Sequence, residues 1–192
     1  MLASEVMVMK RALLLIDIQN DYFPGGRCEL FQPEQAAEKA KLLLQYFRSR
    51  GLPVLYIQHV SESPAGGFFL PGTEGVMIHS SVSPQGEERV LVKHSPNSFF
   101  RTGLEAVLRE LEIEQLVVCG MMSHMCVDST VRAARELGFS VLLAEDACTT
   151  KELSLANAQI PAQIVHRAFM AALGGAFAQV IQAGELISMS VE

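Results

Sequence analysis

The sequence predicts a three-layer α/β fold, in which a six-stranded, mostly parallel sheet has helices on both faces. Short apolar runs alternate along the chain with helix-like segments, the order that produces parallel strands joined by crossover helices. The apolar runs are nearly continuous, which is typical of strands buried on both faces. With 192 residues, of which 49% are hydrophobic, the chain is long enough for one domain with a sizeable core. We therefore expect a single domain over residues 1–192.

The first half of the chain begins with a strand predicted over 11–17, an apolar run that ends in an acid. A loop is expected over 17–26, because Pro and two glycines close it. The segment 33–50 predicts a helix, with Pro in its first turn and Gly just beyond its end. The second strand is expected over 53–58.

The segment 59–88 is long, rich in Gly, Pro and Ser, and lacks periodicity. Loops of this length in a compact domain are usually either functional or disordered. Phe68 and its apolar neighbours would let the segment pack against the rest of the domain. We therefore expect a lid or the wall of a pocket.

The second half continues the alternation of strands and helices. Strands are expected over 89–93, 116–119 and 140–144, and helices over 102–111 and 126–137. The segment 156–173 predicts a helix that can break at Pro161. An edge strand over 176–181 and a short helical turn over 183–187 would complete the fold.

Charge and composition exclude several classes of protein. The formal net charge is −6, and Lys and Arg are sparse and scattered, so no nucleic-acid partner is expected. No apolar run approaches membrane length, and residues 1–10 lack the pattern of a secretory signal. The four cysteines have no CxxC spacing, which favours reduced thiols over disulfides or a zinc site. We expect a cytoplasmic protein that does not bind membranes.

Cys126 stands where the helix after the fourth strand is predicted to begin. A helix N-terminus carries partial positive charge and free N–H groups. Such a position lowers the pKa of a thiol and favours the nucleophilic thiolate. The alternative is a buried structural cysteine, which is the commoner environment of a free Cys.

Two further reactive residues are expected near that thiol. Asp17 ends the first strand and Lys93 ends the third, and parallel strands have their carboxyl ends along one edge of the sheet. If the strand order reverses between the first and fourth strands, Asp17 and Cys126 face each other across the crevice where such sheets bind ligands. An ordinary surface ion pair is the alternative for Asp17 and Lys93.

Three motifs, taken in order, resemble the isochorismatase-like cysteine hydrolase superfamily. They are Ile16-Asp-Ile-Gln-Asn-Asp-Tyr22, the strand-ending Lys93, and Gly120-Met-Met-Ser-His-Met-Cys-Val127. The resemblance extends over nearly the whole chain. The superfamily includes nicotinamidases, N-carbamoylsarcosine amidohydrolases, ureidoacrylate and biuret hydrolases, and isochorismatases.

The resemblance implies a catalytic triad of Asp17, Lys93 and Cys126. It also implies a cis peptide bond between Met121 and Met122. That bond is expected to direct the N–H of Met122, together with that of Cys126, at a developing oxyanion. A homo-oligomer is expected as well, because members of this superfamily commonly assemble.

The implied reaction is hydrolysis of a carbon–nitrogen bond in a small molecule through an acyl-thioester. Asp17 would act as general base and then general acid, and Lys93 would help to ionise the thiol. One alternative is an isochorismatase-type vinyl-ether hydrolase, but that reaction does not need a nucleophilic thiol. Another is a thiol redox or peroxide-sensing protein, for which Cys148 is the candidate resolving residue.

The sequence departs from the metal-binding pattern of the superfamily. Its nicotinamidases hold a metal through an Asp-x-His pair after the second strand, where this chain has Gln58-His59-Val60. His59 and His79 remain, but two neutral imidazoles without a carboxylate make a poor divalent site. No metal and no other cofactor is expected.

A set of polar and aromatic residues is expected to line the substrate pocket. The set consists of Gln19, Phe23, His59, Phe68, Phe99, Ser123 and His124. Ser123 and His124 occupy positions where the superfamily commonly has Thr followed by Asn or Asp. The sequence therefore leaves the role of His124 open.

Overall fold

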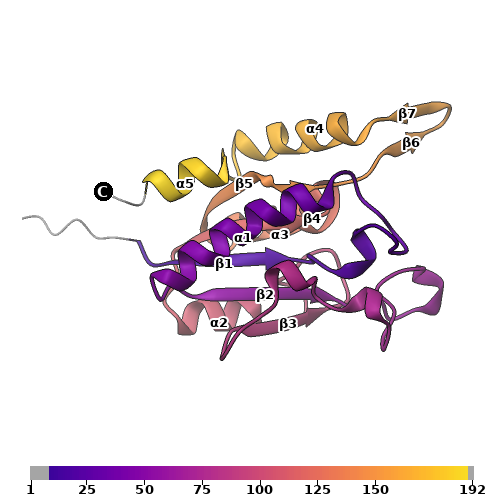
Figure 1. Cartoon of the computed structure of the whole chain (residues 1–192). Coiled ribbons are helices and arrows are strands. Elements are labelled where there is room, and N and C mark those ends of the chain that lie inside the picture. The colour runs from indigo at the N-terminus through magenta and orange to yellow at the C-terminus, as the bar shows by residue number, and fades with distance from the viewer. Residues whose placement is uncertain (1–8, 190–192) are drawn as a thin grey trace, which may run out of the picture.

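The computed structural model describes residues 9–189 and contains a six-stranded sheet whose neighbouring strands are all parallel (Figure 1). The strand order is β3-β2-β1-β4-β5-β8. The strands are β1 (Arg11–Ile16), β2 (Val54–His59), β3 (Arg89–Lys93), β4 (Gln115–Met121), β5 (Ser140–Thr149) and β8 (Gln179–Ile181). The predicted α/β fold is confirmed, and β8 is the edge strand that the sequence predicts.

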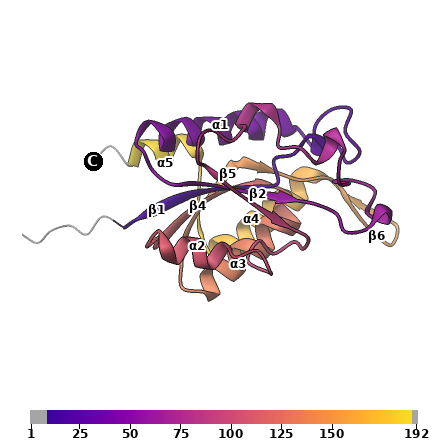
Figure 2. The ribbon, with the colours of Figure 1, turned by 90° about the horizontal axis from the view of Figure 1, so that it is seen from below.

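Helices cover both faces of the sheet (Figure 2). They are α1 (Pro33–Ser49), α2 (Leu104–Glu110), α3 (Asp128–Glu136), α4 (Ala162–Gly174) and α5 (Ala183–Met189). α1 and α5 lie on one face, and α2, α3 and α4 lie on the other. Each face has its own apolar cluster, with side chains of successive strand residues pointing alternately into one or the other. None of the helices in residues 9–189 is long and apolar enough to span a membrane.

The strand order reverses at β1, which pairs with β2 on one side and β4 on the other. Such a reversal opens a crevice at the carboxyl ends of the two central strands. Asp17 follows β1 directly, and the turn that carries Cys126 follows β4. The fold therefore brings together the two segments that the sequence analysis expects to face each other.

β1 and β4 approach each other closely at Gly120. This residue has a φ of +135°, and a Cβ built on it would lie 2.0 Å from the carbonyl oxygen of Ile16. Only glycine fits such an approach, since 2.0 Å is far inside van der Waals contact. β4 then ends in a cis peptide bond between Met121 and Met122.

The prediction that a helix begins at Cys126 is wrong. A π-helical turn, η5 (Ser123–Val127), comes first, and α3 begins only at Asp128. The N–H of Val127 donates to Met122 O at 3.2 Å, which is the wide i→i+5 bond of a π turn. Cys126 thus lies inside this turn rather than at the N-terminus of an α-helix.

The prediction of a helix over 156–173 is correct only in its second part. The first residues belong to a hairpin of β6 (Leu153–Leu155) and β7 (Ala158–Ile160), and α4 starts after Pro161. Ala156 and Asn157 form the two-residue turn, with Ala156 at a φ of +51°. In Figure 1 the hairpin projects from the end of α4.

Residues 60–88, the wall segment, pack over the rim of the sheet as a chain of short 3₁₀ turns: η2 (Pro64–Gly66), η3 (Glu74–Val76) and η4 (Ser80–Val82). A fourth such turn, η1 (Asn20–Tyr22), follows β1. Asp21 of η1 is buried, and its carboxylate accepts the N–H groups of Phe69 at 2.6 Å and of Arg27 at 3.2 Å. The wall segment is therefore fastened to the loop after β1.

Candidate active site

Asp17, Lys93 and Cys126 lie together at the carboxyl ends of β1, β3 and β4. Lys93 Nζ is 2.8 Å from Asp17 Oδ2 and 3.1 Å from Cys126 Sγ. All three residues are buried. Asp17 has a left-handed backbone, with a φ of +50°, at the point where the chain leaves β1 for the loop. The three side chains, far apart in the sequence, thus form one compact cluster.

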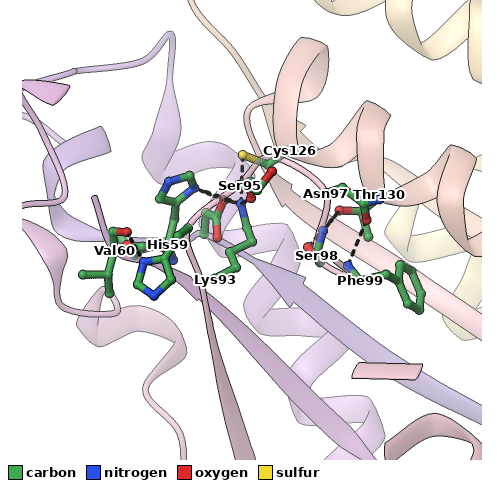
Figure 3. A network of polar contacts seen from close by, with 12 residues as sticks. His59, Val60, Lys93, Ser95, Asn97, Ser98, Phe99, Cys126 and Thr130 are labelled. Carbon is green, nitrogen blue, oxygen red and sulfur yellow. Dashed lines mark hydrogen bonds and ion pairs between the residues drawn. The ribbon is translucent and has the colours of Figure 1, made fainter. Parts of the chain in front are cut away.

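The three protons of the Lys93 ammonium group have three hydrogen-bond acceptors (Figure 3). These acceptors are Cys126 Sγ at 3.1 Å, His59 Nδ1 at 3.0 Å and Ser95 O at 3.0 Å. Asp17 Oδ2 lies closer still to Nζ, at 2.8 Å, and the Asp17 carboxylate is within hydrogen-bonding reach of both Lys93 and the Cys126 thiol. The carboxylate is thus placed beside the thiol proton that it would accept.

Lys93 is a protonated amine despite its burial. Burial alone lowers the pKa of the amine, but Asp17 and Cys126 more than offset this effect and raise the pKa above its ordinary value. The positive charge is therefore a permanent feature of the cluster at neutral pH.

Cys126 is a neutral thiol in the resting protein. Burial raises the pKa of the thiol, and the negative charge of Asp17 raises it further; the nearby Lys93 lowers it only in part. The expectation of a lowered pKa is wrong, because burial and the charge of Asp17 outweigh the lowering by Lys93. Ionisation of Cys126 thus requires a local base, and Asp17 is the carboxylate beside it.

His59 is the fourth polar side chain of the cluster. Burial lowers its pKa to about 4, with a further lowering by the charge of Lys93. Its Nδ1 lies 4.0 Å from Asp17 Oδ2. At neutral pH the imidazole is uncharged, which lets Nδ1 accept the hydrogen bond from Lys93.

The cluster does not fit a divalent cation. Asp17, His59 and Cys126 offer ligand atoms that all lie within 4.8 Å of one another, a spacing that a metal could bridge. Lys93 Nζ, however, lies within about 3 Å of each, so an ammonium ion occupies the position that a metal would take. His79 does not join the cluster; it stacks on Phe23, with ring centroids 3.6 Å apart, and its Nδ1 bonds Ser81 Oγ.

The loop that supplies Ser95 is bound to the helix that follows Cys126. Thr130 of α3 accepts the N–H of Ser98 at 3.0 Å and donates to Ser98 Oγ at 2.8 Å (Figure 3). Both residues are fully buried. These two hydrogen bonds fix the loop that follows Lys93 against α3, the helix that follows Cys126.

Comparison with known proteins agrees with this geometry. The family model described as "Isochorismatase domain" matches residues 11–184. The chain belongs to the isochorismatase family. The isochorismatase family protein YddQ of Bacillus subtilis (strain 168) is 54% identical over 172 residues, which cover 90% of this chain and 96% of YddQ.

Two other similarities are informative. The streptothricin hydrolase of Streptomyces noursei is 34% identical over 169 residues, covering 85% of this chain and 59% of that protein. A crystal structure of an isochorismatase hydrolase from Oleispira antarctica superposes with a TM-score of 0.90, at 47% identity, over 93% of this chain and 96% of that one.

In this isochorismatase-family protein, aromatic rings pack beside the cluster. Tyr22 contacts Phe69 and Phe68, with ring centroids 4.6 and 5.8 Å apart, and Phe69 also lies 5.9 Å from His59. Burial raises the pKa of the Tyr22 phenol, as do the adjacent Cys126 and Asp17. Tyr22 belongs to the first sequence motif but was not among the predicted site residues. Its position five residues after Asp17, in a segment that turns back over the strand end, was the available signal.

Two residues expected in the pocket are buried and hydrogen-bonded within the protein. Gln19 is fully buried; its amide donates to His59 O and Val76 O and accepts the N–H of His59. Ser123 is also fully buried and bonds Thr149 O and His166 Nδ1. Gln19 therefore braces the backbone of the wall segment, and Ser123 braces the turn that carries Cys126.

Phe99 packs against the core on the side of α2. Its ring stacks on Phe139, with centroids 6.1 Å apart, and points away from Cys126 (Figure 3). The remaining candidate, His124, lies on the same turn as Cys126, and its Nδ1 bonds Thr150 Oγ1. Burial lowers the pKa of His124, so this imidazole is neutral at pH 7.

Proposed function

We propose that this isochorismatase-family protein is a cysteine-dependent hydrolase that cleaves a carbon–nitrogen bond of a small molecule through an acyl-thioester. One observation carries the proposal. Lys93 Nζ lies 2.8 Å from Asp17 Oδ2 and 3.1 Å from Cys126 Sγ, so that a carboxylate, an ammonium group and a thiol form one buried cluster. A proton acceptor, a fixed positive charge and a thiol are the groups that nucleophilic catalysis by cysteine requires.

In the first half of the reaction, Asp17 takes the proton of the Cys126 thiol as the sulfur attacks the carbonyl carbon. Lys93 stabilises the thiolate during this transfer, because its N–H already points at Sγ. The N–H groups of Met122 and Cys126 would stabilise the oxyanion of the tetrahedral intermediate. Asp17 then returns the proton to the nitrogen, the carbon–nitrogen bond breaks, and ammonia or an amine leaves.

The second half hydrolyses the acyl-thioester. Asp17, again a carboxylate, accepts a proton from water, and the oxygen attacks the thioester carbon. The carbon–sulfur bond breaks to release the carboxylic acid, and the sulfur recovers its proton from Asp17. No redox partner or metal is needed for this cycle.

A nitrogen-containing substrate is favoured over the vinyl ether of isochorismatase, because cleavage of a vinyl ether does not require a thiol nucleophile. Similarity to a protein named streptothricin hydrolase supports a hydrolytic role in a general sense. Phe68, whose ring is partly exposed beside the buried Tyr22 and Phe69, favours a substrate with an apolar part.

A thiol redox function has little support. All four cysteines are free. Cys148, the candidate resolving residue, is buried in β5, and burial raises its pKa to about 12. Such a thiol is a weak nucleophile toward a sulfenic acid.

The proposal is tested by measuring ammonia or amine release from a panel of primary amides, carbamoyl compounds and ureides, with isochorismate as the vinyl-ether member. We expect at least one nitrogen substrate to be hydrolysed and Cys126→Ala to be inactive. Cys28→Ser, which removes a thiol outside the cluster, should keep full activity. Mass spectrometry of rapidly quenched enzyme should find an acyl adduct on the peptide with Cys126. Full activity of Cys126→Ala, or turnover of isochorismate alone, would refute the mechanism.

A further inference from the structure

Thr130 makes two hydrogen bonds to which the proposed reaction assigns no part. Its Oγ1 accepts the N–H of Ser98 at 3.0 Å and donates to Ser98 Oγ at 2.8 Å (Figure 3). Both residues are fully buried, and a buried hydroxyl that both accepts and donates holds its partner in one geometry. Ser98 belongs to the loop that follows Lys93 at the end of β3, so Thr130 holds that loop against α3.

Thr130 lies four residues after Cys126 in the sequence. Residues four apart in a helical segment lie on the same face, about one turn from each other. That face is turned toward the loop after β3, because Cys126 Sγ is 3.1 Å from Lys93 Nζ and Thr130 Oγ1 reaches Ser98. The segment that carries the thiol is therefore attached to the ammonium side of the cluster at two points, one in each turn.

The start of the turn that carries the thiol is held independently. Ser123 Oγ bonds Thr149 O of β5 at 3.1 Å and His166 Nδ1 of α4 at 2.8 Å. If the hydroxyl of Thr130 were removed, these bonds would remain, and only the side that faces the ammonium group would be released. The buried N–H and hydroxyl of Ser98 would then need new partners, so the loop and α3 would move apart.

The ammonium group stabilises the sulfur over a short distance only, because a charge-assisted hydrogen bond weakens steeply as donor and acceptor separate. Ser95 O, in the same loop, accepts another N–H of Lys93 at 3.0 Å, so movement of the loop would disturb the ammonium group as well. We propose that Thr130 is a positioning residue: its bonds to Ser98 hold the thiol against the ammonium group, which can then stabilise the thiolate. The proposal rests on the proposed function, because it deepens the account of the same site.

The role of Thr130 depends on its hydroxyl group, so two substitutions separate the possibilities. Thr130→Val keeps the branched side chain but removes both hydrogen bonds, whereas Thr130→Ser keeps the hydroxyl. Val131→Ala is the control for lost packing, because Val131 is fully buried on the same helix and has no polar side-chain group. Ser98→Ala removes the bond to Oγ alone and leaves Thr130 in place.

Alkylation of Cys126 by iodoacetamide measures the reactivity of the thiol without any substrate. The second-order rate constant is determined at pH 7.5 by mass spectrometry, in a Cys28→Ser background, because Cys28 is the most exposed of the four thiols. We expect Thr130→Val to react about tenfold more slowly than the parent, which corresponds to a thiol pKa about one unit higher. Thr130→Ser and Val131→Ala should react within about twofold of the parent, and Ser98→Ala about threefold more slowly.

A double variant shows whether the effect passes through the ammonium group. In a Lys93→Met background, Thr130→Val should change the alkylation rate by less than about twofold, because no charge is left to be positioned. The proposal is overturned if Thr130→Val reacts at the parental rate, if Val131→Ala is equally slow, or if the loss of rate is as large without Lys93.

Near-UV circular dichroism checks the fold of each variant. Should Thr130→Val fold poorly, a parental rate for Ser98→Ala overturns the proposal instead. Failure of the proposed function would show itself differently, as absence of turnover across the amide panel while Thr130→Val still slows alkylation. The two hypotheses can thus be rejected separately.

Discussion

Within residues 9–189, Lys93 is the one permanently charged partner of Asp17, and this pairing affects the stability of the protein. Lys93 is buried with Asp17 as its carboxylate partner at 2.8 Å. In Asp17→Asn the ammonium group would stay in the core without a counter-ion, a situation that typically costs 3–5 kcal/mol. The left-handed backbone at residue 17 is no obstacle, since Asn tolerates it well.

We therefore predict that Asp17→Asn abolishes hydrolysis and lowers the free energy of unfolding by about 3 kcal/mol, as measured by urea denaturation. Asp17→Asn combined with Lys93→Met should regain most of that stability, because the unpaired charge is gone, yet remain inactive. An Asp17→Asn protein as stable as the parent would show that Lys93 does not depend on this ion pair.

His59 gives a second prediction, on pH. The pKa of His59 is about 4 in the folded protein and near 6.5 in an unfolded chain. Between these values the unfolded state binds more protons, so the free energy of unfolding must fall as the pH drops from 6.5 toward 4. The charged or titratable groups that act on the ring are Lys93, Asp17 and His94.

We expect His59→Asn to have a shallower acid dependence than the parent within this window and the same dependence above pH 7. Urea denaturation at half-unit pH intervals, with the two curves subtracted, isolates the contribution of the imidazole from that of the carboxylates. Parallel curves between pH 4 and 6.5 would contradict a depressed pKa.

At the scale of single residues, the sequence predicted the three groups of the cluster but not the protonation state of the thiol. Asp17 and Lys93 could be identified because each ends a predicted strand, and Cys126 because it stands where the next helix was predicted to begin. The acceptor from Ser95 is a backbone carbonyl, which every residue has, so no sequence pattern reveals it. The thiol pKa depends on burial and on Asp17, which become known only when the side chains are placed.

At the scale of elements, the junction of β1 and β4 depends on one glycine. We predict that Gly120→Ala lowers the free energy of unfolding by at least about 3 kcal/mol or prevents soluble expression, because Cβ would overlap the carbonyl of Ile16. Gly138→Ala is the matched control: its φ is +90°, but nothing lies within 4 Å of the added Cβ.

Gly138→Ala should therefore lower the free energy of unfolding by backbone strain alone, about 1–2 kcal/mol. Thermal and urea denaturation of both variants check this difference. Equal losses for the two would mean that strain, and not the close approach of the strands, accounts for the effect at Gly120.

Two elements were predicted wrongly because the sequence signals for them are weak or absent. The segment 156–173 contains many helix-forming residues, so its pattern favoured one long helix. Asn157 in a two-residue turn and Pro161 before α4 separate a hairpin from the helix, and both signals are local and weak beside the Ala content. The π turn at Cys126 has no sequence signature at all, since its residues also suit an α-helix.

At the scale of the whole molecule, the fold class was predictable because it follows from the alternation of strands and helices, whereas the strand reversal at β1 was only a condition of the sequence analysis and is given by the structure. The state of assembly is a further expectation. Leu155 of the β6–β7 hairpin is 72% exposed and Ile164 of α4 is 53% exposed, and the two elements adjoin. Apolar side chains exposed in this way favour an interface with another copy of the chain.

We predict a homo-oligomer with a mass that is a multiple of 21.0 kDa in size-exclusion chromatography with light scattering. Leu155→Lys together with Ile164→Lys should shift the protein toward the monomer. Met77→Lys, at a residue that is 52% exposed in the wall segment, should leave the mass unchanged. A parent protein that elutes at 21.0 kDa would exclude the oligomer.

The way the wall segment is attached affects which of its residues can be substituted during evolution. Gln19 and Asp21 hydrogen-bond to main-chain groups: the N–H and carbonyl of His59 at the end of β2, and the carbonyl of Val76 and the N–H of Phe69 in the wall segment. Every amino acid except proline provides those groups. Apart from Gly75, where an added Cβ would lie 2.1 Å from Oδ1 of Asp21, side chains along this stretch can therefore be exchanged to suit a new ligand while the hydrogen bonds that hold its backbone persist.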